Sequence, residues 1–70
     1  MKTMQKLLEI SSRIEHLEKS AEWIAKETVH ADSAVSQTAT MIYSLADDIQ
    51  ARVTELVKAV EEYNNLGLYH

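Results

Sequence analysis

Three residue types are scarce in this chain of 70 residues: it has no cysteine, no proline and a single glycine, Gly67. Sheets and loop-rich domains depend on tight turns, and glycine and proline are two of the main turn formers. Their shortage argues against those folds. Without cysteine the chain has no disulfide, no thiolate zinc site and no cysteine nucleophile, which fits a reducing compartment. We therefore expect a cytoplasmic protein.

Long apolar runs are also lacking. The longest uninterrupted run is three residues, as in Trp23-Ile24-Ala25, whereas a membrane helix needs about 20. The first residues carry lysines but no apolar block or cleavage site of the kind found in signal peptides. We expect neither a membrane span nor a membrane partner.

Positive charge is sparse in the second half of the chain. Up to Ala31, five basic residues balance five glutamates, but after it only Arg52 and Lys58 accompany six acidic residues, which gives the net charge of −4. Nucleic-acid binding normally rests on a basic stripe that neutralises phosphates. This chain has no such stripe, so no nucleic-acid partner is predicted.

Apolar residues recur with the period of an α-helix along the whole chain. In a heptad that starts with Leu7 at position a, large apolar residues occupy positions a and d toward both ends of the chain, whereas the middle is weaker, with Ala21, Thr28, Ala31 and Thr38 at these positions. At Arg52, a d position, the stripe shifts to position e, because a 3.6-residue helix drifts against a 3.5-residue repeat. The predicted oligomer core consists of Leu7, Ile10, Ile14, Leu17, Ile24, Ile42, Leu45, Ile49, Val53, Leu56 and Val60.

A chain reversal is predicted at His30-Ala31-Asp32-Ser33. Asp32 or Ser33 can cap a new helix by accepting hydrogen bonds from its first N–H groups, and His30 suits the carbonyl end of the preceding helix. The predicted elements are a helix over about 3–30, a turn over about 30–33, a helix over about 33–64 and a tail over 65–70. The fold class is therefore all-α, an antiparallel helical hairpin in one domain. The alternative is a single long helix in a coiled coil, because the heptad register continues through residue 32.

One hairpin of this length has a thin core. Pairing two hairpins into a four-helix bundle is the simplest remedy without disulfides or metals, so we expect a homodimer, with a tetramer as the second choice. Four acid–base pairs spaced i, i+4 mark the solvated sides, to which Gln50 is also assigned. These pairs are Glu9 with Arg13, Glu15 with Lys19, Glu22 with Lys26, and Asp48 with Arg52.

The segment from Thr28 to Ala46 is rich in small residues: ten of its 19 residues are Ala, Ser or Thr, and Asp32 is its only charge. One interpretation is that this end of the hairpin packs tightly, with hydroxyl groups donating to carbonyls one turn earlier. The other is a docking surface that costs little to desolvate. The sequence does not separate the two.

Trp23 lies off the apolar stripe, in a row with His16 and His30 at seven-residue intervals. It either covers the edge of the bundle or anchors a contact with another protein, since buried aromatic residues dominate interface energetics. The candidate partner surface is His16, Trp23, Met41 and Tyr43.

Catalytic, cofactor-binding and metal-binding residues are not predicted. The chain is interpreted as a non-catalytic, self-associating helical protein, a protein–protein interaction or small regulatory or scaffold module. The alternative is a small helical-bundle metal-binding protein or enzyme that uses Glu27 and His30, whose i, i+3 spacing is the Glu-x-x-His arrangement of di-iron bundles.

Overall fold

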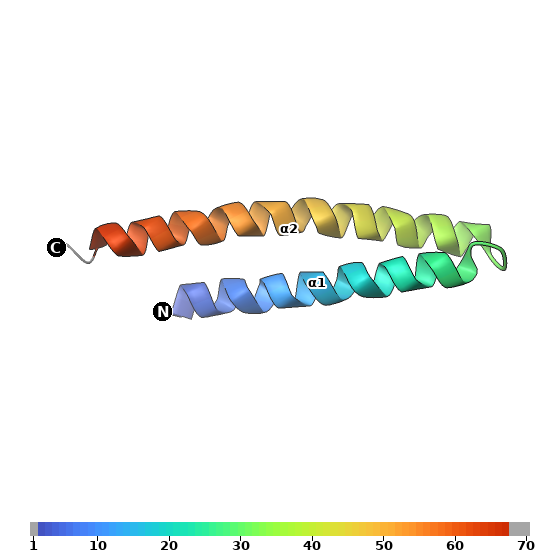
Figure 1. Ribbon diagram of the computed structural model, residues 1–70, viewed down its shortest axis with the longest axis horizontal. Helices are drawn as coiled ribbons and strands as arrows, with labels where there is room; N and C mark the ends of the chain where they lie inside the picture. The colour runs from blue at the N-terminus through green and yellow to red at the C-terminus, as the bar shows by residue number, and fades with distance from the viewer. Residues whose placement is uncertain (1, 68–70) are drawn as a thin grey trace.

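The computed structural model describes residues 2–67, which form two antiparallel helices lying side by side (Figure 1). Helix α1 spans Lys2–Thr28 and helix α2 spans Ser33–Gly67. The molecule measures 59 × 15 × 11 Å. This confirms the predicted all-α hairpin and excludes the single continuous helix, because the chain reverses its direction at residues 29–32.

The reversal is held by hydrogen bonds from residues on both of its sides. The Thr28 carbonyl accepts from the backbone N–H groups of Ala31 and Asp32, at 3.2 and 2.8 Å. The Asp32 carboxylate accepts from the Val35 N–H at 3.2 Å, and the Asp32 carbonyl accepts from the Ser36 N–H at 3.0 Å. Asp32 is thus the N-cap of α2, the role that the sequence assigned to it or to its neighbour.

The helix ends differ from the predicted ones by two or three residues. Helix α1 stops at Thr28 rather than near residue 30, and α2 continues to Gly67 rather than stopping near residue 64. Asn64 and Asn65 do not end α2, because each costs a helix only about 0.6 kcal/mol relative to alanine. Of the predicted tail 65–70, residues 68–70 lie outside the described residues.

Two side-chain contacts between the helices fix their register. The Ser36 hydroxyl donates to the Ala25 carbonyl at 2.8 Å, and the Gln50 amide donates to the Ser11 hydroxyl at 2.9 Å. In both pairs the residue numbers add up to 61, so each residue of α1 lies level with the α2 residue that completes this sum. By this rule Lys2 is level with Ala59, and the last two turns of α2 extend beyond the start of α1 (Figure 1).

Small residues line the contact between the two helices. Ala21, Ala39 and Ala46 are 4%, 4% and 1% exposed, and Ser36 is also buried. Such small side chains allow helix axes to approach closely. We call this contact the inner seam; it also contains the half-buried Ser11, Ile14, Glu18, Ala25 and Gln50, and, toward the open end, Leu7, Val53, Val57 and Val60.

The Ala/Ser/Thr-rich segment therefore packs against α1 through Ser36, Ala39 and Ala46. Its threonine hydroxyls donate to carbonyls four residues earlier: Thr28 to Ile24 at 2.7 Å, Thr38 to Ala34 and Thr40 to Ser36, each of the last two at 2.9 Å. This is the first of the two interpretations that the sequence left open.

Candidate functional site: the open apolar face

Most of the predicted oligomer core lies outside the inner seam. Seven of its eleven residues are exposed, by 39% for Ile24 up to 61% for Leu45. The other four, Leu7, Ile14, Val53 and Val60, are half-buried in the seam. Six of these seven exposed residues, all but Leu45, follow one side of the hairpin together with Val35. We call this side the open face; it comprises Ile10, Leu17, Ile24, Val35, Ile42, Ile49 and Leu56.

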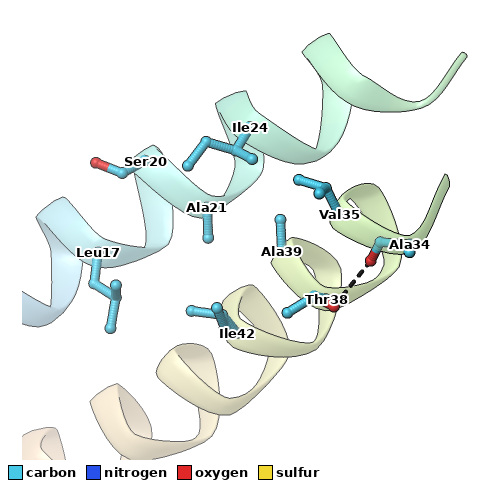
Figure 2. Close-up of a pocket in the computed structure, with 9 residues that line it drawn as sticks. All are labelled: Leu17, Ser20, Ala21, Ile24, Ala34, Val35, Thr38, Ala39 and Ile42. Atoms are coloured by element: carbon cyan, nitrogen blue, oxygen red, sulfur yellow. Dashed lines mark hydrogen bonds between the residues drawn. The ribbon is translucent and has the colours of Figure 1, made fainter. Parts of the chain in front are cut away.

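Toward the turn, the open face is hollowed into an apolar groove of about 420 Å³ (Figure 2). Its floor contains Ala21 and Ala39, which lie between the helices. Larger side chains from both helices form its walls, with Leu17 and Ile24 on α1 and Val35 and Ile42 on α2. A groove arises here because alanines at the seam are flanked by branched side chains that stand out from it.

The opposite side of the hairpin, which we call the polar face, carries charged residues of α1. Glu15 pairs with Lys19 at 3.1 Å and Glu22 with Lys26 at 2.8 Å. Hydrogen bonding to Glu22 and the charge of that carboxylate raise the pKa of Lys26 above its ordinary value, and Tyr43 makes a smaller contribution in the same direction. The two broad sides of the hairpin are therefore chemically unlike.

The remaining two acid–base pairs that the sequence predicted do not form. Arg52 pairs instead with Glu55, at 3.7 Å. Within residues 2–67, Glu9, Arg13 and Asp48 take part in no ion pair. Lys6, Glu9 and Arg13 line a shallow hollow together with Ile10, so they border the open face.

The candidate partner surface is divided between different sides of one hairpin. His16 and Trp23, which is 65% exposed, are offset by about 180° around α1 from the inner seam, since Trp23 follows Ala21 by two residues, or about 200°. Met41 is 72% exposed on the outer side of α2. Tyr43 instead lies near Lys26 of the polar face, whose pKa it helps to raise. A single hairpin does not bring these four residues together.

Glu27 and His30 are both exposed at the turn end of α1. Among the residues that the structure describes, no group of three or more His, Asp or Glu side chains is placed to hold a metal ion. Over the same residues, neither helix has an apolar stretch of the length that a membrane span needs.

The prediction that Gln50 lies on a solvated side of the hairpin is wrong. Its amide is part of the inner seam, donating to the Ser11 hydroxyl and, at 3.3 Å, to the Ser11 carbonyl. The heptad pattern missed Ser11, Ala25, Ser36 and Gln50 because it follows large apolar side chains. A signal that could have found the seam is the spacing of small residues by three or seven positions, as in Ser36, Ala39 and Ala46.

Comparisons with known proteins identified no relative of the chain. No protein-family model, no curated protein and no solved structure matches the chain.

Proposed function

We propose that the protein is a non-catalytic, self-associating helical module. In this proposal the open face of one hairpin is covered by the open face of a second copy, and the resulting four-helix bundle serves as a protein–protein interaction or scaffold unit. The observation that carries the proposal is the open face itself: seven large apolar residues on one side, each at least 39% exposed in the single chain.

The size of the open face supports a protein interface. Viewed down its shortest axis, as in Figure 1, the hairpin presents a side of 59 by 15 Å, or about 900 Å². A standard stable interface buries about 800 Å² on each partner. One hairpin side therefore offers enough surface for a dimer.

The layering of apolar residues supports a second copy as the occupant. In the register of the hairpin, each large residue of α1 on the open face lies almost level with one of α2. The three layers are Ile24 with Val35, Leu17 with Ile42, and Ile10 with Ile49. These layers repeat every seven residues. A second copy presents layers with the same spacing, so apolar side chains of the two copies meet at every level, as in four-helix bundles.

The test compares two substitutions of exposed apolar residues by aspartate. Ile49 is 41% exposed on the open face, whereas Leu8 is 54% exposed and lies two residues before Ile10, away from that face. Ile49→Asp places a carboxylate in the shared core at a cost of several kcal/mol, so it is expected to give a monomer with little helix. Leu8→Asp is expected to remain a helical dimer.

Sedimentation equilibrium and circular dichroism measure both outcomes. The same oligomer mass and helicity for wild type, Ile49→Asp and Leu8→Asp would contradict the proposal, because the open face would then contribute nothing to assembly.

A further inference from the structure

The charges that border the open face form two stripes of alternating sign. On α1, the stripe consists of Lys6, Glu9 and Arg13; on α2, it consists of Asp48, Arg52 and Glu55. The signs are positive, negative, positive on α1 and negative, positive, negative on α2. We call these stripes the outer edges, because each lies on the side of its helix that faces away from the other helix of the hairpin.

Their position follows from the turn of about 100° per residue in an α-helix. On α2, Gln50 is in the inner seam and Ile49 is on the open face, so Asp48 lies one further step around the helix, at the outer edge. On α1, Ser11 is in the seam and Ile10 is on the open face, so Glu9 lies at the outer edge. Within one chain the two stripes are thus on opposite sides and do not meet.

From these stripes we infer that the two copies pair with their turns at the same end of the bundle. This inference rests on the proposed function, because it requires that the open face be covered by a second copy. Two face-to-face orientations are available to a symmetric pair. The two-fold axis is either parallel to the helices, with both turns at one end, or perpendicular to them, with the turns at opposite ends.

With the axis parallel to the helices, rotation leaves each residue at its own level along the bundle. Helix α1 of one copy then lies over α2 of the second copy in the register found within the hairpin, where residue numbers add up to 61. The outer edges meet under this rule as Lys6 with Glu55, Glu9 with Arg52, and Arg13 with Asp48. All three pairs are of opposite sign, and symmetry doubles them to six.

With the axis perpendicular to the helices, each helix lies against its own copy, running the other way. In the register that sets Ile42 of one copy level with Ile49 of the other, the charges of Asp48, Arg52 and Glu55 then lie against residues 34–45 of the second α2, a stretch without any charged residue. The apolar layers are evenly spaced and fit either orientation. The charges of the outer edges therefore favour pairing at the same end, because unpaired or like charges at the edge of an interface disfavour the opposite-end orientation.

Pairing at the same end also brings two residues of the candidate partner surface, Trp23 and Met41, to one side of the dimer. Trp23 and Met41 lie at almost the same level but on opposite outer sides of one hairpin. When α1 lies over the α2 of a second copy, Trp23 of one copy and Met41 of the other share a side of the bundle. The bundle then has two identical aromatic and apolar patches for a further protein, one on each side.

Distance measurements between spin labels distinguish the orientations. The chain has no native cysteine, so Ala31→Cys labels the turn and Ser44→Cys labels α2 near mid-height of the hairpin. Same-end pairing predicts an intermolecular distance below about 30 Å between labels at Ala31. Opposite-end pairing separates the turns by at least the length of α1, 27 residues, or about 40 Å.

The Ser44 label gives an intermolecular distance below about 40 Å in either orientation. A short distance at both positions supports the inference. A short distance at Ser44 with a long one at Ala31 overturns the orientation and leaves self-association standing. No intermolecular distance at either position overturns the proposed function as well.

Charge exchange provides a second test, made at low ionic strength because salt screens exposed pairs. Arg13→Glu and Asp48→Lys each create two like-charge contacts in the same-end dimer and are expected to raise its Kd roughly fivefold. A mixture of the two variants restores both pairs and is expected to form the heterodimer in preference to either homodimer. If the two variant chains form homodimers and heterodimers at random, with unchanged circular dichroism, the pairing of Arg13 with Asp48 is overturned.

Discussion

The inner seam and the open face contain different kinds of residue, although both are continuous along the same two helices. Residues of the seam are mostly small or polar from the turn to mid-height, as in Ala21, Ser36 and Ala46, and they are buried by the hairpin itself. Residues of the open face are large and apolar, as in Leu17 and Ile42, and the hairpin leaves them exposed. Small residues thus hold the hairpin closely packed, while the residues with most to gain from burial stay exposed in the single chain; in the proposed function a second copy covers them.

The largest effect expected within the hairpin comes from Ala46→Leu. Ala46 is 1% exposed, so a leucine has no space and forces the helices apart, at a cost of about 3 kcal/mol. The matched control is Ala51→Leu, which adds the same group to an exposed site of the same helix. Thermal melting should show a large decrease in Tm for the first variant only. Equal Tm values would mean that the seam is not closely packed.

A smaller effect is expected from Gln50→Glu, which keeps the shape of the side chain but replaces a donor by a carboxylate beside the Ser11 carbonyl. Losing this half-buried bond should cost about 1 kcal/mol, or about 5 °C in Tm. Gln37→Glu, at an exposed position, is the control. The difference between the variants should shrink near pH 4, where a protonated glutamate can donate again. A Tm difference that does not change with pH would contradict this explanation.

The smallest effect is expected on the polar face, from Glu22→Gln. The Lys26 ammonium is exposed, and exposed pairs contribute little to stability, so Tm should not change measurably at neutral pH. Because Glu22 raises the pKa of Lys26, any stabilisation is fully present below the ordinary lysine pKa of 10.5 and is lost as the pH rises through the raised value. Removing the Glu22 carboxylate should lower the Lys26 pKa toward 10.5, which NMR titration of the variant measures. A large loss of Tm at pH 7 would show that the polar face is part of a buried interface.

The sequence predicts the fold well but not which side of each helix packs inside the hairpin. Helical period, the scarcity of glycine and proline, and the Asp32 cap were enough to predict two antiparallel helices. The apolar stripe also identified the open face, because Ile10, Ile49 and Leu56 have the large side chains that a hydrophobic pattern detects. Such a pattern does not detect a seam of alanine, serine and glutamine, whose stability comes from close approach and from hydrogen bonds between distant residues, such as Ser11 with Gln50.

The orientation of two copies depends on the structure for the same reason. The outer edges are visible in the sequence as alternating charges, but the proposed pairing of Arg13 with Asp48 can be inferred only once the register is known. That register is set by two polar contacts of the inner seam, neither of which follows from periodicity.

The most direct test of self-association is the Tm of the wild-type chain at protein concentrations from about 1 to 100 μM. If folding and dimer formation are one event, mass action requires Tm to rise with concentration, by about 5 °C for each tenfold increase, given about 0.7 kcal/mol of unfolding enthalpy per residue. Sedimentation at the highest concentration should give twice the chain mass of 7.9 kDa. A fully helical chain that sediments as a monomer and melts at one temperature throughout this range would contradict the account.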